Sequence, residues 1–422
     1  MLTAIILFAL TYILLLALPK WRAIIAIASA LMFIILGILP INKVLGSVDF
    51  NVLMMIAGTM GTVSLFIESK MPSLLADLIL EHTPNIKWAI VSLALFAGIV
   101  SAFVDNVATV LMTAPVALAI CKKLEINPVP VIIAIAVSSN LQGAATLVGD
   151  TTSILLGGYA GMDFMDFFVF RGRPSIFWAV ELGAVLSAIV LLWLFRSNTA
   201  KISVDTRTKV EDYIPTVLLA GTIILLICAS FIPNKPEITN GLICVGILII
   251  GLIYTAFKTR NLKKIIQPLK DIDLTTLFLL FGLFIVIGGI TEAGVIDELA
   301  ELFVKVGGDS LFLIYTLIVW ASVLFSAFID NIPYVATMLP VVQGISSMMG
   351  VEPYLLYFGL LVGATLGGNL TPIGASANIT GIGILRKAGY EVKTKDFLRI
   401  GLPFTLAAVL AGYIYTWLVW GA

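Results

Sequence analysis

Long apolar runs separated by short polar stretches dominate the sequence. A helix needs about 20 apolar residues to cross the hydrocarbon layer of a membrane, because lipid offers no partner for backbone polar groups. Ten runs meet this requirement and predict transmembrane helices. They cover residues 3–18, 22–39, 50–68, 130–158, 176–195, 213–232, 238–257, 274–291, 355–384 and 400–420. The pattern therefore predicts an all-α polytopic membrane protein.

Two further apolar stretches, 86–121 and 310–348, fit poorly as single helices. Each carries an Asp-Asn pair near its middle and a proline a few residues later. This pattern predicts re-entrant hairpins, in which a helix enters the membrane, turns at the polar pair and returns to the same face. Irregular backbone of this kind is tolerated at membrane depth only where protein or a watery cavity surrounds it.

The composition agrees with a chain embedded in a lipid bilayer. Of the 422 residues, 60% are apolar and 12% are charged, whereas about a quarter of the residues in a soluble domain are charged. The 25 basic and 25 acidic residues cancel, so nothing indicates a nucleic-acid partner. The three cysteines have no metal-ligand spacing, and the single histidine, His82, lies in a polar stretch. Neither a zinc site nor a catalytic histidine is predicted.

The basic residues predict an orientation. With the N-terminus outside the cell, the ten spans place 20 of the 25 lysines and arginines on the cytoplasmic side, as the positive-inside rule requires. Both termini are then outside, and the protein is expected in the cytoplasmic membrane. The first apolar run lacks a basic n-region and a cleavage site, so it is predicted to be a retained span. This arrangement leaves no lysine or arginine inside any span or hairpin.

The chain contains an internal duplication. Ser101-Ala-Phe-Val-Asp-Asn106 matches Ser326-Ala-Phe-Ile-Asp-Asn331 at an offset of 225, and Asp49 and Glu68 match Asp273 and Glu292 at an offset of 224. We therefore predict a first repeat over 1–195, a cytoplasmic linker over 196–212 and a second repeat over 213–422. Each repeat has five crossing helices, and this odd number inverts the second copy relative to the first. The two hairpin tips should then meet near the bilayer midplane.

Three aspartates, Asp105, Asp150 and Asp330, lie inside apolar segments, where a charge is costly and usually functional. With no basic residue in these segments, three explanations remain open. The carboxyl groups are protonated, they coordinate a transported cation, or they accept hydrogen bonds from helix N-termini at the hairpin turns. The first two predict coupling to H⁺ or Na⁺. For Glu181, near the end of a span, a structural role explains the carboxylate equally well.

Glycine, hydroxyl and amide side chains interrupt two of the spans at matching positions. Gly143-Ala-Ala-Thr-Leu-Val-Gly149 corresponds to Gly368-Asn-Leu-Thr-Pro-Ile-Gly374, again at an offset of 225. These interruptions predict broken helices over 130–158 and 355–384. Freed carbonyl oxygens in such segments suit Na⁺, and the N-terminus of a half-helix suits an anion.

These motifs resemble the ion-transporter superfamily, which holds arsenite permeases, sodium/proton antiporters, plant silicon effluxers and the melanosomal P protein and shares a citrate transporter-like domain. The P-protein branch is the most similar. The divalent anion:sodium symporters resemble the chain more distantly, since their hairpin tips carry Ser-Asn-Thr where this chain has Asp105-Asn106-Val107 and Asp330-Asn331-Ile332. Two nearby carboxylates would repel a dianion, which disfavours dicarboxylate transport.

The resemblance implies a homodimer in which a transport domain moves against a scaffold domain by an elevator-type displacement, with no cofactor and no enzymatic activity. It implies that Asp105, Asp330 and Asp150 couple transport to H⁺ or Na⁺. Position 150 departs from the internal symmetry, because its counterpart is Ala375. Na⁺ would be held near Asn106, Gly149, Asn331 and Gly374. The implied ligands of the substrate or ion are Asn106, Asn331, Thr146, Gly149, Thr151, Ser153, Asn369, Thr371, Gly374, Ser376 and Asn378.

The leading functional hypothesis is a secondary transporter of a small inorganic ion or oxyanion, such as arsenite or antimonite, driven by a proton or sodium gradient. The alternative is a sodium/proton antiporter. A sodium-coupled dicarboxylate transporter, a channel and an intramembrane aspartyl protease rank lower. The protease hypothesis is weak because Leu147-Val-Gly-Asp150 lacks the first glycine of the Gly-x-Gly-Asp signature and no Tyr-Asp partner motif is present.

Overall fold

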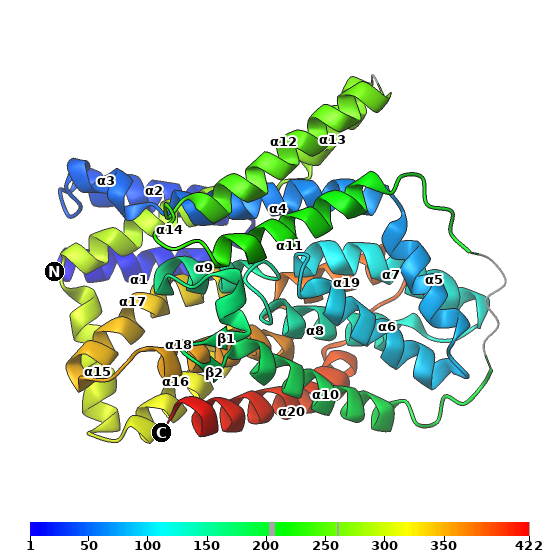
Figure 1. Ribbon diagram of the computed structural model, residues 1–422. Coiled ribbons are helices and arrows are strands. Elements are labelled where there is room, and N and C mark those ends of the chain that lie inside the picture. Colours follow the sequence, from blue (N-terminus) through cyan, green and yellow to red (C-terminus); the bar gives the residue numbers. More distant parts are fainter. Residues whose placement is uncertain (202–206, 260, 422) are drawn as a thin grey trace.

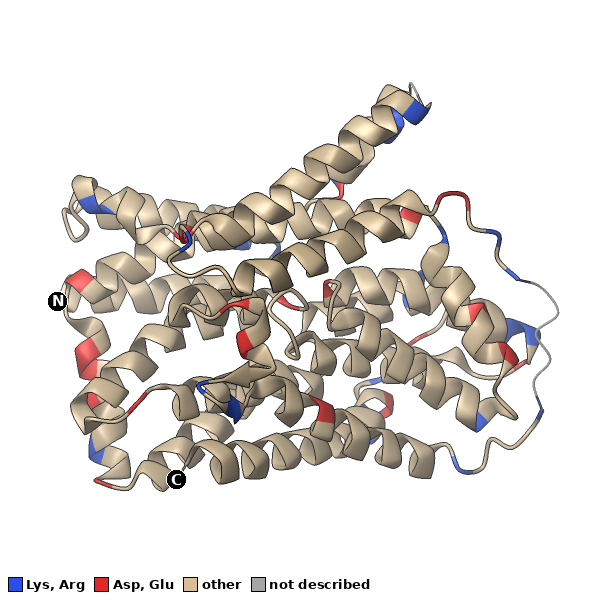
Figure 2. Cartoon of the chain, in the orientation of Figure 1, with Lys and Arg blue, Asp and Glu red and all other residues tan. Residues whose placement is uncertain are grey.

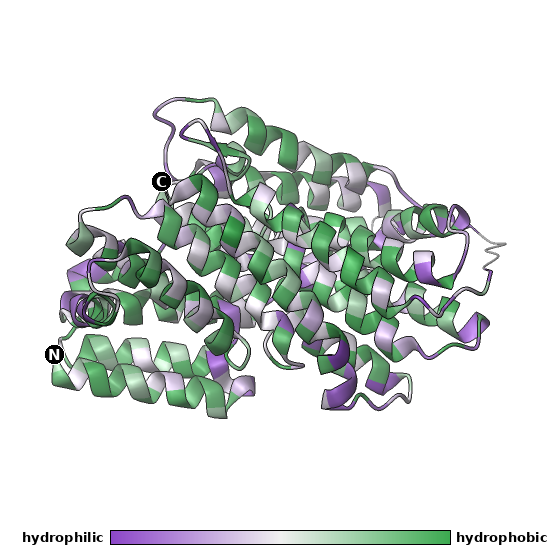
Figure 3. Ribbon diagram, turned by 90° about the horizontal axis from the view of Figure 1, so that it is seen from below, coloured by the Kyte–Doolittle hydropathy of each residue, from purple (hydrophilic) through white to green (hydrophobic). Residues whose placement is uncertain are grey.

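The computed structural model describes residues 1–201, 207–259 and 261–421 as a bundle of helices with one short β-hairpin. Most helices run along the long axis of the molecule, whereas α5 (Met71–Glu81) and α15 (Val295–Gly307) lie across it near opposite ends (Figure 1). Most charged residues lie toward the two ends (Figure 2), and the helices between them are largely apolar (Figure 3). This distribution is typical of a membrane protein and confirms the predicted fold class.

The first half of the chain ends at α10. Its elements are α1 (Leu2–Ala17), η1 (Pro19–Trp21), α2 (Arg22–Ile35), α3 (Ile41–Ser47), α4 (Phe50–Glu68), α5, α6 (Ile86–Ser101), α7 (Asn106–Lys123), α8 (Pro128–Gly143), α9 (Thr151–Ala160), η2 (Phe164–Phe167), β1 (Val169–Phe170), β2 (Arg173–Pro174) and α10 (Ile176–Leu194). The strands pair in antiparallel fashion.

The second half follows the same order of helices. Its elements are α11 (Ile214–Ser230), α12 (Thr239–Thr259), α13 (Leu262–Lys270), α14 (Leu274–Glu292), α15, α16 (Leu311–Ser326), α17 (Asn331–Met349), α18 (Tyr354–Leu361), η3 (Val362–Leu366), η4 (Gly368–Leu370), α19 (Ser376–Lys387) and α20 (Thr394–Trp420). The short helices α3, α5, α13 and α15 were not predicted, because they are too short or too polar to stand out as membrane spans.

The number of long helices is smaller than the ten predicted spans. Within the described residues, seven helices are long and apolar enough to cross a membrane, or up to nine if each of two bent pairs counts as one span. The bent pairs are α1 with α2, at 113°, and α15 with α16, at 117°. Most of the difference arises because several predicted spans are short helices, and 130–158 and 355–384 are each divided in two.

Each region predicted to form a hairpin consists of two helices joined by a short turn. Residues 102–105 separate α6 from α7, and residues 327–330 separate α16 from α17. Asp105 caps α7 by accepting hydrogen bonds from the amides of Val107 and Ala108 at 3.0 and 3.1 Å. Asp330 caps α17 through the amide of Ile332 at 3.2 Å. The capping role left open by the sequence is therefore present at both tips.

Both predicted broken helices are present as well. Residues 144–150 interrupt the path from α8 to α9, and a π-turn, a 3₁₀ turn and residues 371–375 interrupt the path from α18 to α19. Thr146 Oγ1 donates to the carbonyl of Ala102, and Thr371 Oγ1 donates to the carbonyl of Ala327. The same contact, 225 residues apart, therefore fastens each broken helix to the turn of its own hairpin.

The outer helices of the two halves pack in corresponding ways. Helix α4 packs against α12, and α14 packs against α2. A Cβ at Gly58 would lie 2.4 Å from the carbonyl carbon of Cys244, and a Cβ at Gly282 would lie 2.6 Å from that of Ala26. Along the long axis, α4 leads from α3 toward α5, whereas α14 leads in the opposite direction toward α15 (Figure 1). Helices α6–α10 and α16–α20 form a second group around the buried helix α8.

The other residues singled out in the sequence take structural positions. His82 is exposed at the end of α5. Cys121, Cys228 and Cys244 are unpaired. Glu181 is half-buried in α10 and does not line the cavity described below.

The described part of the linker is fastened to α5. Arg207 Nε donates to Glu81 Oε1 at 2.6 Å, and the amide of Thr208 donates to Asp77 at 2.8 Å. The Arg207 guanidinium lowers the pKa of Glu81 below its usual value. Because the pKa is lower in the folded state, the stabilisation is present above the unfolded value of about 4.3 and is lost as the pH falls through the folded value.

We therefore expect the hydrogen-exchange protection factor of the Thr208 amide to fall between pH 6 and pH 3. The Arg207→Gln variant is the control, because its protection factor should be lower at pH 6 and should fall less between pH 6 and pH 3 than that of the wild type. Equal pH dependence in both proteins would contradict the assignment.

Candidate functional site

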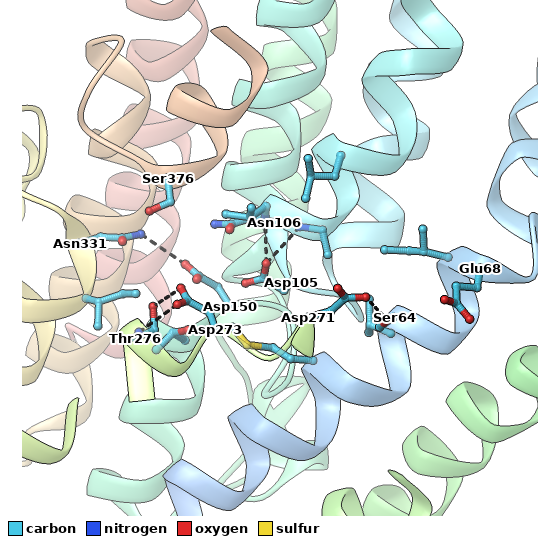
Figure 4. A pocket seen from close by; sticks show the side chains of 18 residues that line it. Ser64, Glu68, Asp105, Asn106, Asp150, Asp271, Asp273, Thr276, Asn331 and Ser376 are labelled. Atoms are coloured by element: carbon cyan, nitrogen blue, oxygen red, sulfur yellow. Dashed lines mark hydrogen bonds between the residues drawn. The ribbon is translucent and has the colours of Figure 1, made fainter. Parts of the chain in front are cut away.

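A cavity of about 360 Å³ lies where both hairpin tips and both broken helices meet the second half of α4 and the start of α14. Its apolar wall comes mainly from α4 and α7. The cavity is lined by Met60, Val63, Ser64, Ile67, Glu68, Asp105, Asn106, Val107, Ala108, Leu111, Asp150, Thr151, Asp271, Asp273, Thr276, Asn331, Ile332 and Ser376. Figure 4 shows their side chains converging from these elements.

Five of the lining residues are acidic, and none is a lysine or arginine. Glu68, Asp271 and Asp273 are exposed, Asp105 is half-buried and Asp150 is buried. The acids therefore extend from the solvent toward the interior. A confined space lined by charges of one sign raises the local concentration of ions of the opposite sign. The cavity is thus suited to attract protons and cations.

Asp150 joins the two repeats at the inner end of the cavity. Its Oδ2 accepts hydrogen bonds from Thr152 Oγ1 at 2.9 Å and from Asn331 Nδ2 at 3.3 Å. Asp150 belongs to the first broken helix, whereas Asn331 belongs to the tip of the second hairpin. The carboxylate that breaks the internal symmetry of the sequence therefore forms a direct contact with the opposite half.

A chain of asparagine side chains continues from the first hairpin tip into the interior. Asn106 Nδ2 donates to Asn140 Oδ1 at 3.0 Å, and Asn140 Nδ2 donates to Asn369 Oδ1 at 3.1 Å. Asn369 in turn donates to the carbonyl of Val137 at 3.0 Å. These buried amides hold the first hairpin, α8 and the second broken helix in a fixed arrangement, because leaving any one unpaired would be costly.

Backbone carbonyls surround Gly149 and Gly374. A Cβ at Gly149 would lie 2.7 Å from the carbonyl oxygens of Ser101 and Ala102. A Cβ at Gly374 would lie 2.8 and 2.9 Å from those of Ser326 and Ala327. Each hairpin turn therefore presents two carbonyl oxygens to its broken helix, which is the type of ligand that Na⁺ prefers in such sites.

The surroundings of Asp330 differ from the prediction, because a basic residue lies beside this intramembrane aspartate. Arg22 Nη1 donates to Asp330 Oδ2 at 2.6 Å, and Ser376 Oγ donates to the same oxygen at 3.2 Å. Arg22 is the first residue of the predicted span 22–39 and is one of the 20 basic residues placed on the cytoplasmic side. In the structure it begins α2 and reaches the tip of the second hairpin. Asp330 therefore has a basic partner, which none of the three explanations left open by the sequence includes.

The predicted site residues divide into two groups. Asp105, Asn106, Asp150, Thr151, Asn331 and Ser376 line the cavity. The other group lies outside its lining and holds the surrounding backbone: Ser153 donates to the carbonyl of Gly143, and Asn378 donates to those of Gly368 and Thr371. This second group consists of Asp330, Thr146, Gly149, Ser153, Asn369, Thr371, Gly374 and Asn378.

Four charged residues at or beside the cavity are not among the site residues predicted from the sequence: Glu68, Asp271, Asp273 and Arg22. A signal existed for two of them, because Glu68 and Asp273 belong to the acidic pairs that match between the repeats. No such signal exists for Asp271 and Arg22, which lack an acidic or basic partner in the other repeat. Within the described ranges, no three Asp, Glu, His or Cys side chains converge closely enough to hold a metal ion.

Several known proteins are similar to this chain in sequence. A membrane protein of 46 kDa from Mycobacterium leprae is 34% identical over 336 residues, covering 77% of this chain and 76% of that protein. The human P protein is 27% identical over 448 residues, covering 87% of this chain and 53% of the P protein. This chain therefore spans about half of the P protein.

Two solved transporter structures share the fold. The YdaH transporter of Alcanivorax borkumensis has a TM-score of 0.63 at 16% identity, covering 89% of this chain and 87% of that one. MtrF of Neisseria gonorrhoeae, described as representing a class of antimetabolite efflux pumps, has a TM-score of 0.56 at 14% identity, covering 88% and 81%. The fold is therefore that of a multi-pass integral membrane protein.

The citrate transporter family matches residues 12–363, which is most of the chain. The match confirms the resemblance to the ion-transporter superfamily, whose members move solutes rather than catalyse reactions. The chain belongs to the citrate transporter family.

Proposed function

We propose that this secondary transporter exchanges a small inorganic cation for protons, with Na⁺ as the first candidate. The observation that supports this proposal is the cavity with five carboxylates and no lysine or arginine among its lining residues. Such a cavity attracts cations and repels anions. Competition between H⁺ and Na⁺ for the same carboxylates would couple their movements in opposite directions.

Asp105 and Asp150 are the carboxylates that we assign to this exchange. Asp105 keeps Oδ1 bonded to the start of α7, and its side chain faces the cavity. Asp150 lies deeper, where its bond to Asn331 links the two repeats. Binding of a cation or a proton at Asp150 would change the strength of its hydrogen bond to Asn331. Occupancy of the site would thereby influence how the halves move relative to each other.

A second candidate is transport of a solute that avoids repulsion by the carboxylates. Neutral arsenite, As(OH)₃, meets this condition, and the amide and hydroxyl groups of Asn106, Asn331 and Ser376 could bind it. The family description names citrate. Because five carboxylates would repel a free polycarboxylate, such a solute would enter only with metal cations that neutralise its charge.

We further propose a homodimer in the cytoplasmic membrane, with both termini outside and a movement of the elevator type. The bias of basic residues toward one side supports the orientation. The two packing groups, α1–α4 with α11–α14 and α6–α10 with α16–α20, support the division into a scaffold and a moving domain.

The exchange can be tested with purified protein in liposomes that contain a pH-sensitive dye. An inward Na⁺ gradient should drive protons out and raise the internal pH, and protein-free liposomes should show no such change. The same vesicles then receive K⁺, Li⁺, arsenite, and citrate with and without Mg²⁺. Proton movement with arsenite or magnesium citrate alone would contradict the proposal and favour the second candidate.

A further inference from the structure

The two hairpin tips occupy different environments in this structure. Asp105 faces the open cavity, whereas Asp330 is 5% exposed and is paired with Arg22. Tyr12 in α1 donates to the carbonyl of Pro333 at 2.7 Å, close to the same tip. The second tip is therefore held against α1 and α2, and the first tip is not held in the corresponding way.

The internal symmetry identifies the counterpart of Arg22. Gly58 and Gly282 occupy equivalent positions, 224 residues apart, and they contact Cys244 and Ala26 respectively. Cys244 is therefore equivalent to Ala26, an offset of 218 (244 − 26). Four residues earlier in α12 and α2, the same offset pairs Asn240 with Arg22. The arginine thus has a neutral counterpart in the other repeat.

Among the described residues, neither hairpin tip forms a hydrogen bond with Asn240. Its Nδ2 donates to Asp163 Oδ1 at 3.2 Å, and its Oδ1 is buried without a hydrogen-bond partner among the described atoms. Inverted repeats reach their opposite-facing state when the halves exchange conformations. In that state, Asp105 would approach Asn240, and Asp330 would leave Arg22 and face a cavity.

We propose that Arg22 is a tethered cation that takes the place of the coupling cation at Asp330 whenever the second hairpin tip is closed. A carboxylate buried to this extent needs a positive partner or a proton. Arg22 supplies that partner in the state seen here. When the tip opens, Asp330 must take H⁺ or Na⁺ from solution instead, whereas Asp105 never has such a substitute. This inference rests on the proposed cation coupling.

The first arm of the test measures conformation and requires no transport. Cys121, Cys228 and Cys244 are replaced by alanine, and Met60→Cys places one thiol in the cavity wall. The rate of modification by N-ethylmaleimide in unsealed membranes reports how often the cavity is open. Because the Arg22–Asp330 pair exists only in the cavity-open state, Arg22→Gln should slow the reaction about fivefold or more.

Matched variants separate the pair from a general effect of charge. Arg22→Lys should keep most of the wild-type rate, and Lys20→Gln, which removes a charge from the same turn, should keep all of it. Asp330→Asn should slow the reaction like Arg22→Gln, and the double variant should slow it no further. An unchanged rate in Arg22→Gln, or fully additive effects, would overturn the inference.

The second arm measures coupling in liposomes. Without the competing guanidinium, Arg22→Gln should need a lower Na⁺ concentration for half-maximal flux, whereas Lys20→Gln should match the wild type. An unchanged or raised half-maximal concentration in Arg22→Gln would overturn the proposed competition. If the wild type moves no cation while the modification rates change as expected, the proposed exchange is wrong. Arg22 would then stabilise one conformation without replacing a coupling cation, and the inference would be overturned.

Discussion

Replacing Asp105 with asparagine should reduce cation-coupled proton flux in liposomes by about 100-fold or more, since an amide cannot take up a proton. The substitution leaves the volume unchanged. Asparagine also caps helices well, so its oxygen can still accept the bonds from the amides of Val107 and Ala108. The flux should therefore fall because the charge facing the cavity is removed, while the fold stays intact.

The matched control is Asp212→Asn. Asp212 accepts a bond from the amide of Ile214 at the start of α11, at 3.0 Å, and is not among the residues that line the cavity. It also pairs with Lys258 at 2.7 Å, a partly exposed ion pair of the kind that contributes little to stability. This variant should transport like the wild type, and both variants should show the wild-type thermal midpoint in detergent. Normal coupled flux from Asp105→Asn would show that Asp105 carries neither the proton nor the cation. A lowered thermal midpoint would instead indicate that the cap was lost.

The parts of the fold that could be predicted are the membrane spans, hairpin turns and broken helices, because each has a recurring sequence pattern. Apolar length located α4 at 50–68 and α10 near 176–195, because lipid imposes a minimum length on each span. The Asp-Asn pairs located both hairpin turns, since a helix that restarts after a turn needs a side chain to cap its free amides. Because the motifs repeat at an offset of 225 residues, the hairpin and the broken helix identified in one repeat also located those in the other.

The remaining site residues could not be predicted, because their positions depend on contacts between segments far apart in the sequence. Arg22 reaches Asp330 across 308 positions of the chain because α1 and α2 are short and meet at 113°. In the sequence, the same arginine borders an apolar run and looks like a loop residue. Asp271 also lies outside any apolar run, and only the packing of α14 beside α4 places it in the cavity. Charges at the ends of spans are therefore the least predictable part of such a site.

The second large effect is expected from adding a single methyl group at Gly149. In the Gly149→Ala variant, the new Cβ would lie 2.6 Å from the carbonyl oxygen of Gly143 and 2.7 Å from those of Ser101 and Ala102. Because these atoms belong to the backbone, no side-chain rotation relieves the contacts. Overpacking of this kind costs about 1–3 kcal/mol, and the rigid neighbours place this case at the upper end. We expect a lower thermal midpoint and loss of coupled flux.

The internal symmetry supplies a second variant, and α19 supplies the control. Gly374→Ala should have the same effect, because its Cβ would meet the carbonyls of Gly368, Ser326 and Ala327. Gly383→Ala adds the same methyl group in α19, where no described atom outside the neighbouring turns of the helix lies within 4 Å of the new Cβ. That variant should be as active as the wild type and slightly more stable, since alanine favours the helix. Full activity in Gly149→Ala would show that the broken helix can separate from the hairpin turn, and the carbonyl oxygens beside Gly149 would then be poor candidates for holding Na⁺.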